Sequence, residues 1–197
     1  MPAITPPSTE VPLIQQPEAQ TTSGPDPLPY YSASDKDRVS EMLHEIHEVL
    51  EKQVKPNEQS AHKVRRMWEP SDRLERLPQM IEELSRVEDE IRNQHQKLNS
   101  DIRKRYQRYE KIFAKVAGDQ VLISMSELAN EVRNYRENMQ FTSDIFNALD
   151  DSELAGKLVH LNNASMRCFR DKSAKLSGYV EDCIKRIRAT EHELLGR

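Results

Sequence analysis

Apolar side chains recur every three and four residues along most of the chain after residue 34. This spacing gathers them on one face of an α-helix, and its persistence over several heptads is typical of coiled coils. No segment shows the alternation of apolar and polar residues that a half-buried strand requires. The pattern therefore predicts an all-α protein in which long helices pack side by side.

The clearest repeat runs from Leu74 to Val116, where ten of thirteen core positions over six heptads are apolar. One core position holds Leu77, Leu84, Ile91, Leu98, Arg105 and Ile112, and the other holds Leu74, Ile81, Glu88, His95, Ile102, Tyr109 and Val116. Proline is tolerated in the first turn of a helix but kinks its interior. Pro78 therefore predicts that this helix begins near Leu77 or bends there.

Two more long helices are expected after a break at Gly118-Asp119. Ser124 and Glu127 have the spacing of a capping box, which predicts a helix that ends at residue 149. Asp150-Asp151-Ser152 ends it and caps the last helix, from about 153 to 195. The apolar stripes of these two helices include Met125, Leu128, Val132, Tyr135, Met139, Phe146, Leu176, Val180 and Ile187.

The N-terminal part has a different composition. Residues 1–33 contain eight of the eleven prolines and only three charged residues, so they predict a disordered Pro-rich tail. A helix is expected to begin at Ser34, with Asp37 as a capping partner, and to end before Pro56; a short basic helix over 60–68 follows. The expected regions are the tail (1–33), short helical segments with a linker (34–70) and a long-helix bundle (71–197).

The connections between the long helices are short, so successive helices should fold back as an elongated antiparallel coiled coil or three-helix bundle. At 1.5 Å per residue the helices would be roughly 64, 39 and 64 Å long, so the middle one cannot cover the other two. Uncovered apolar stripe is usually an interaction surface, and partner helices are expected to complete the core. The predicted partner interface consists of Leu77, Ile81, Leu84, Ile91, Leu98, Ile102, Tyr109, Met125, Leu128, Val132, Tyr135, Met139, Phe146, Leu176, Val180 and Ile187.

The charge balance argues against binding to nucleic acid or to a membrane surface. The formal net charge is −4, and it is −1 beyond residue 33, so there is no global field that attracts polyanions. Residues 103–109 interleave arginines with tyrosines, as a single-strand binder would, but a charged flank of the helix seam is favoured. The basic stretch 62–68 could touch a membrane surface or an acidic partner; packing of Trp68 at a helix junction is favoured.

Catalytic motifs are lacking in the sequence. There is no glycine-rich phosphate loop and no nucleophile paired with a base, so we expect no enzyme activity and no cofactor. His44 and His47 could share a metal, but a third ligand is missing, so no metal site is expected. Glu88 and His95 occupy core positions, either as a buried polar pair that fixes the register or as a stretch without a partner.

The cysteines and the hydropathy bear on the compartment. Cys168 and Cys183 fall in one expected helix about 22 Å apart, too far for a disulfide, so a reduced cytoplasmic location is expected. No apolar run approaches the roughly 20 residues that cross a bilayer, so stable membrane insertion is not expected.

Residues 74–195 resemble the small shoulder subunit of dynactin, dynactin subunit 3. The similarity lies in the helix plan and in segments Ile102–Ile112, Asn147–Ser152, Lys157–Leu161 and Asp171–Leu176. The resemblance implies helical bundles shared with dynamitin and the large microtubule-binding dynactin subunit. It also implies support of dynein-driven transport and an association with the cytoskeleton or centrosome. The N-terminal third departs from the family pattern.

The sequence thus predicts a non-catalytic structural subunit of a cytosolic multiprotein complex. It would form a hetero-oligomer with other coiled-coil subunits and bind no nucleic acid. The alternative is a membrane-associated helical tethering or curvature module, which would need a continuous basic surface.

Overall fold

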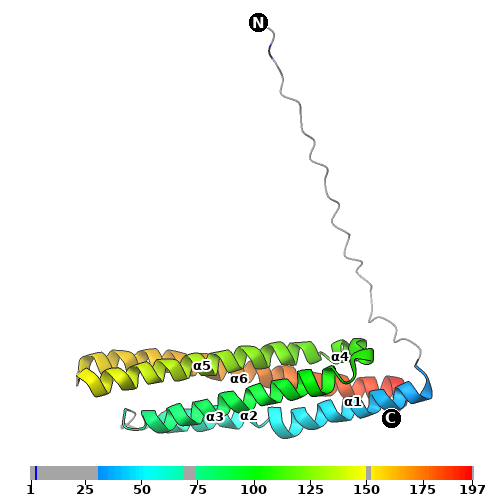
Figure 1. Ribbon diagram of the computed structural model, residues 1–197, viewed down its shortest axis with the longest axis horizontal. Helices are drawn as coiled ribbons and strands as arrows, with labels where there is room; N and C mark the ends of the chain where they lie inside the picture. The colour runs from blue at the N-terminus through cyan, green and yellow to red at the C-terminus, as the bar shows by residue number, and fades with distance from the viewer. Residues whose placement is uncertain (1–2, 4–30, 69–73, 150–151, 197) are drawn as a thin grey trace. The chain divides into compact units, whose positions relative to one another are not determined.

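The computed structural model describes residues 3, 31–68, 74–149 and 152–196 (Figure 1). Of these residues 91% are helical and none lies in a strand, which confirms the all-α prediction. The predicted tail, residues 1–33, lies almost entirely outside the described residues. Ser32–Arg197 forms one compact unit. The helical segments before residue 70 therefore belong to the same compact unit as the long helices.

Four helical columns, named here by their order along the chain, make up this unit (Figure 1). The first column is α1 (Ala33–Val49), the π-helical η1 (Leu50–Val54) and α2 (Asn57–Trp68). The second is α3 (Leu77–Gln96), the π-helical η2 (Lys97–Arg103), η3 (Gln107–Tyr109) and α4 (Glu110–Lys115). The third is α5 (Gly118–Leu149) and the fourth is α6 (Ser152–Leu195).

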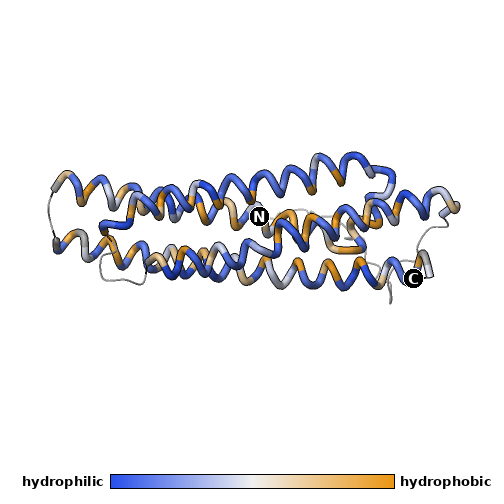
Figure 2. Tube along the Cα trace, turned by 90° about the horizontal axis from the view of Figure 1, so that it is seen from below, coloured by the Kyte–Doolittle hydropathy of each residue, from blue (hydrophilic) through white to orange (hydrophobic). Residues whose placement is uncertain are grey.

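The columns close into an antiparallel four-helix ring. α5 packs against both α3 and α6, and α6 also packs against α1 and α2, which in turn meet the second column. Side-chain hydrogen bonds across the four interfaces join Asn57 to Gln94, Arg92 to Asn130, Asn162 to Thr142, and Ser177 to Glu58. Figure 2 shows apolar positions recurring at intervals along every column. A three-helix bundle would lack the first column, and with it the contacts of α2 with α3 and with α6.

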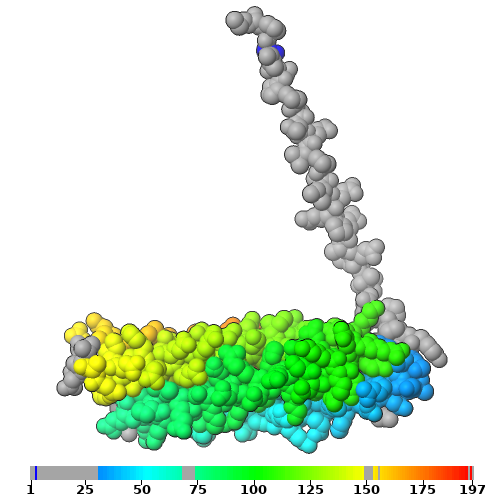
Figure 3. All heavy atoms as spheres, viewed as in Figure 1, coloured from blue at the N-terminus to red at the C-terminus, as the bar shows by residue number. Residues whose placement is uncertain are grey.

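The core runs the length of the ring. Its largest fully buried side chains include Tyr135, Phe113, Phe169, Leu43 and Leu84, contributed by all four columns. Each buried side chain of this kind contributes about 1.5–3 kcal/mol of transfer free energy. Figure 3 shows the spheres of α3 and α5 adjoining along their length on the face in view. The first column supplies the cover that the sequence analysis assigned to partner helices.

Two helix starts test the capping predictions. The cap of α1 is Ser32 rather than Ser34, and its hydroxyl accepts a hydrogen bond from the Asp35 backbone N–H at 3.1 Å. α3 begins at Leu77, so Pro78 lies in the first turn, where its missing N–H costs nothing. The predicted start near Leu77 is confirmed.

The second column is not one uninterrupted coiled-coil helix. It changes to π-helix at Lys97 and breaks after Arg103, before the short η3 turn. At the break Tyr106 is buried in place of Arg105, which is exposed, and beyond it the predicted core positions Tyr109, Ile112 and Val116 are buried again. The prediction of six continuous heptads with Arg105 at a core position is therefore wrong.

The turn between α4 and α5 depends on Ala117 and Gly118. Ala117 adopts the left-handed conformation with φ 60°, and α5 begins at the next residue. A Cβ at Gly118 would lie 2.5–2.8 Å from the ring of Phe113, so a larger residue would have to displace this buried ring. The predicted capping box at Ser124 is wrong, because Ser124 is buried inside α5.

Candidate partner interface

The predicted partner residues lie in the core of a single chain. Fourteen of the sixteen are buried, and Ile81 and Phe146 are half-buried. The buried residues are Leu77, Leu84, Ile91, Leu98, Ile102, Tyr109, Met125, Leu128, Val132, Tyr135, Met139, Leu176, Val180 and Ile187. They contact the chain's own helices, so the expectation that they form an open seam for other subunits is corrected.

The arginines of residues 103–108 point to carboxylates of the same chain. Arg103 binds Glu110 and lies 3.4 Å from Asp119, which raises the pKa of its guanidinium. Arg105 pairs with Glu45, and its guanidinium also lies over the Tyr106 ring, 5.1 Å from the centroid. This pairing supports the favoured interpretation of the cluster as a charged flank.

Asp35 is the second anchor of that cluster. Its carboxylate accepts a hydrogen bond from the Tyr109 hydroxyl at 2.7 Å and lies 3.5 Å from Arg108. The Tyr109 hydrogen bond, followed by that of Ser32, lowers the pKa of Asp35. The basic segment thus fastens the start of α1 to the second column.

Glu88 makes a buried polar contact between α3 and α5. Its two carboxylate oxygens lie 3.5 Å from Arg92 and 3.3 Å from Arg136. The oxygen nearer Arg136 is buried and makes no hydrogen bond among the described residues, so this contact is electrostatic. Arg136 also reaches Ser85, so one residue of α5 contacts two residues of α3. Among the described residues Glu88 is thus paired with arginines rather than with His95.

His95, the other polar core position, is half-buried. Burial lowers the pKa of its imidazole, and nearby Arg92 lowers it further. His95 therefore favours the neutral form more strongly than a free histidine does.

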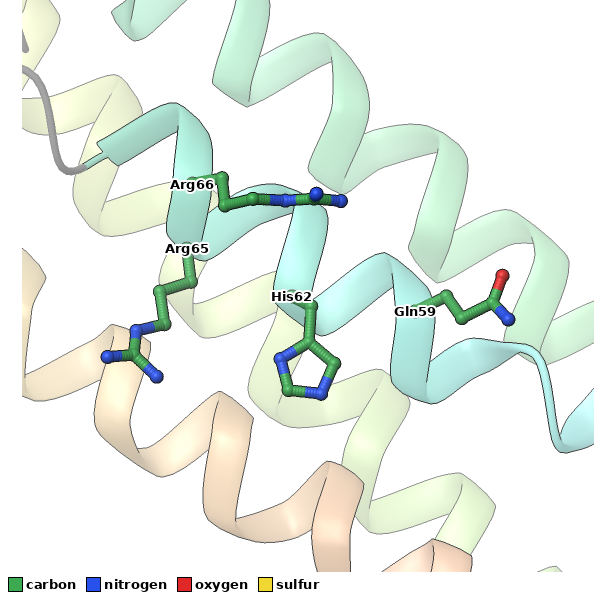
Figure 4. Close-up of a pocket in the computed structure, with 4 residues that line it drawn as sticks. All are labelled: Gln59, His62, Arg65 and Arg66. Atoms are coloured by element: carbon green, nitrogen blue, oxygen red, sulfur yellow. The ribbon is translucent and has the colours of Figure 1, made fainter.

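The basic stretch on α2 lines a shallow surface pocket (Figure 4). Arg65 and His62 extend towards α6, while Arg66 and Gln59 extend towards α3. All four lining residues come from one helix, and neighbouring Lys63 already pairs with Glu83 of α3 at 3.2 Å. The side chain of Trp68, expected to pack at this junction, lies outside the described residues.

A second depression lies between the first two columns, where their π-helical segments meet. Its lining includes His44, Glu45, Glu48, Lys52 and Arg105. Four of the charges that face it form ion pairs, Arg105 with Glu45 and Lys52 with Glu48, and Lys97 and Asp101 also line it. The depression is a charged seam between packed columns.

Metal and thiol chemistry receive little support from the described residues. Among them no group of three or more His, Cys, Asp or Glu side chains could hold a metal ion. Both cysteines are free; Cys168 is exposed, and burial raises the pKa of the Cys183 thiol to about 12. Cys183 is therefore protonated and unreactive at neutral pH.

Two of the three large apolar side chains that are exposed among the described residues, Phe141 and Leu161, lie towards the free end of the α5–α6 hairpin. Phe141 is 54% exposed and Leu161 is 45% exposed. Phe141 lies one residue before Thr142, and Leu161 lies one residue before Asn162. Thr142 and Asn162 are hydrogen-bonded to each other across the two helices. Moving one residue towards the N-terminus rotates the side-chain direction by about 100° around each helix axis. Because α5 and α6 are antiparallel, these two rotations bring Phe141 and Leu161 to the same outer side of the helix pair. Phe141 and Leu161 therefore share one face.

This face continues the three-four rhythm on both helices. We call it the hairpin-end face, formed by Phe141, Ile145 and Ala148 of α5 and Leu154, Leu158 and Leu161 of α6. Ile145 and Leu154 are half-buried, and Leu158 is 8% exposed. Ile123, as exposed as Phe141 at 54%, lies five turns away along α5 and belongs to no such cluster. This face was not predicted from the sequence, because the inner apolar stripe of each helix is more regular.

No protein-family model, curated protein or solved structure matches this chain. Among the described residues, no helix combines the length and the apolar character that crossing a bilayer requires.

Proposed function

We propose that this chain is a non-catalytic structural subunit of a multiprotein assembly and that it docks through the hairpin-end face. One observation carries the proposal: two adjacent helices present apolar residues at heptad spacing outside a core that is already closed. Such a two-helix surface fits the apolar side of a further amphipathic helix. A contiguous apolar patch on an otherwise charged bundle is a typical interaction site.

The dynactin-like version of this proposal names the partners. The docking helix would then come from dynamitin or from the large dynactin subunit, and the bundle would support dynein-driven transport. The buried seam residues would contribute by keeping the bundle rigid, and the contacts with partners would fall to Phe141, Leu161 and their neighbours.

The alternative of a membrane tether needs a continuous basic surface. The arginines at 103, 105 and 108 have carboxylate partners within the chain, which leaves the basic stretch of α2 as an isolated patch. Binding to anionic liposomes at low salt would favour this alternative over the scaffold.

The experiment compares proximity labelling around three forms of the full chain in its native cells. The forms are the wild type, a Phe141→Ser/Leu161→Ser double variant and Ile123→Ser, a control of equal exposure outside the face. The proposal expects the double variant to lose a defined set of neighbours that Ile123→Ser retains. Binding of those neighbours is then reconstituted with purified coiled-coil segments, including dynamitin. Identical neighbours for all three forms would refute docking through this face.

A further inference from the structure

We propose that the hairpin-end face binds the same face of a second copy of this chain, which forms a two-fold dimer. The inference rests on the proposed function and identifies the first partner of the docking face. It follows from the shape of the face, from the distribution of charge along its rims, and from the helix directions that a two-fold axis would bring together.

The helix directions favour self-pairing. α5 and α6 run antiparallel, and a two-fold axis parallel to them places α6 of one copy over α5 of the other. Every helix then has antiparallel neighbours, as in the four-column ring of the chain itself, and helix dipoles are opposed throughout. Phe141, Ile145, Leu158 and Leu161 of both copies would form a second core.

The rims of the face carry opposite charges. Asp144 lies two residues after Thr142, so it points to the side of α5 away from α6. Lys157 lies five residues before Asn162 and points to the side of α6 away from α5. Within one chain these two exposed residues are therefore on opposite edges. Lys157 pairs with Glu153 on the same helix at 3.7 Å, and both of these side chains are largely exposed.

The two-fold axis brings these edges together. It places the α5 rim of one copy beside the α6 rim of the other, at the same level along the bundle. The Thr142–Asn162 contact marks one level along the bundle axis. Asp144 lies two residues and Lys157 five residues from this level in the same direction, so Asp144 and Lys157 of the second copy are offset by about three residues, or about 4.5 Å along the axis. A lysine side chain spans that offset. Two symmetric Asp144–Lys157 pairs would thus flank the apolar centre.

The size of the face sets the expected affinity. It covers two helical stretches of eight residues, roughly 12 Å each, so its area is well below the ~800 Å² per partner of a standard stable interface. We therefore expect a reversible dimer with a dissociation constant in the micromolar range.

The first experiment is sedimentation equilibrium of the full chain over a wide concentration range. Wild type and Ile123→Ser are expected to dimerise alike, and Phe141→Ser/Leu161→Ser is expected to weaken dimerisation by at least about a hundredfold, because polar atoms replace the apolar centre. Circular dichroism checks that the double variant keeps its helix content. A wild type that remains monomeric at every concentration overturns the inference.

The second experiment tests the rim pairing directly with Asp144→Lys and Lys157→Asp. Each variant alone places like charges at both rims, and we expect each to dimerise about tenfold more weakly than the wild type. Mixed together, the two variants place opposite charges at both rims, so the mixed dimer is expected to regain wild-type affinity. Variants that weaken dimerisation without rescue on mixing overturn the proposed geometry.

The outcomes separate this inference from the proposed function. A monomeric chain whose Phe141→Ser/Leu161→Ser variant still loses its cellular neighbours retains the scaffold proposal and loses the dimer. A dimer that pairs as predicted while the cellular neighbours are unchanged retains the dimer and loses the docking of other subunits through this face.

Discussion

Truncation of Ile91 tests whether the seam belongs to the chain's own core. Ile91 lies in α3 and has no exposed surface in a single copy. Ile91→Ala removes three carbon atoms from this packed site and leaves a cavity. Substitutions of this type cost about 2–5 kcal/mol, since lost transfer free energy and the cavity add. For a domain of this size the midpoint of thermal unfolding would fall by roughly 4–20 °C.

The assay is urea unfolding of the isolated chain, followed by circular dichroism at low and high protein concentration. Ile123→Ala is the matched control, because Ile123 is 54% exposed, lies outside the hairpin-end face, and its truncation should cost under about 1 kcal/mol. The cost of Ile91→Ala should be similar at both concentrations, because the contact that it removes lies within one chain.

The reasoning would be refuted in either of two ways. Ile91→Ala could lower the free energy of unfolding by less than about 0.5 kcal/mol, a value typical of exposed positions. Alternatively, the wild-type chain could lack a cooperative transition until coiled-coil partners are added. Either result would indicate that Ile91 lies in an interface with other subunits and not in the core of the single chain.

Three further predictions concern local features. Ala117→Gly should stabilise the chain by about 1 kcal/mol because φ is 60° there, and Gly118→Ala should destabilise it by crowding Phe113; thermal melts measure both. Glu88→Gln should cost about 1 kcal/mol, and less at high salt, because both its arginine partners reach solvent; urea melts at two salt concentrations test this. The pKa of His95 is lowered in the fold, so below about pH 6.5 the unfolded chain binds more protons than the folded chain, and the free energy of unfolding falls as the pH is lowered. His95→Gln should abolish that part of the loss, which urea melts across this pH range measure.

The sequence was sufficient for the parts of the fold that depend on local rhythm. The apolar spacing predicted the long helices, Pro78 placed the start of α3, and Asp150–Ser152 placed the boundary between the last two helices. The break after Arg103 was not predictable from spacing, because a π-helical turn shifts the register without changing residue types.

The main error concerned the first column. Its helix was recognised from Val39, Met42 and Ile46, but its position in the ring was not, because spacing within a segment does not tell which other segment covers it. Without that column the three later helices have an uncovered stripe; with it, the stripe is closed. The candidate docking face was missed for a related reason: Phe141 and Leu161 lie in different helices, and only the antiparallel pairing brings them to one side.

The buried contact between Thr142 and Asn162 links the stability of the bundle to the docking face. Asn162 Nδ2 donates to Thr142 Oγ1 at 3.0 Å, and Thr142 donates to the Asn138 carbonyl oxygen at 2.9 Å. Asn162 Oδ1 is buried without a hydrogen bond among the described residues. A buried polar group that makes no hydrogen bond carries a desolvation cost, so removing that group stabilises the fold. Removing the acceptor of an existing hydrogen bond has the opposite effect, because it leaves the buried donor without a partner.

Thr142→Val should therefore cost about 1–3 kcal/mol, because it leaves the Asn162 amide without its acceptor, while Asn162→Leu should be neutral or stabilising. The double variant should recover the loss of Thr142→Val, and a double-mutant cycle of urea melts measures this coupling. A larger cost for Asn162→Leu than for Thr142→Val would contradict the assigned bonding. Because this contact sets the level of α5 against α6, an apolar pair allows the helices to slide. The double variant, though stable, should then dimerise more weakly through the displaced Phe141 and Leu161.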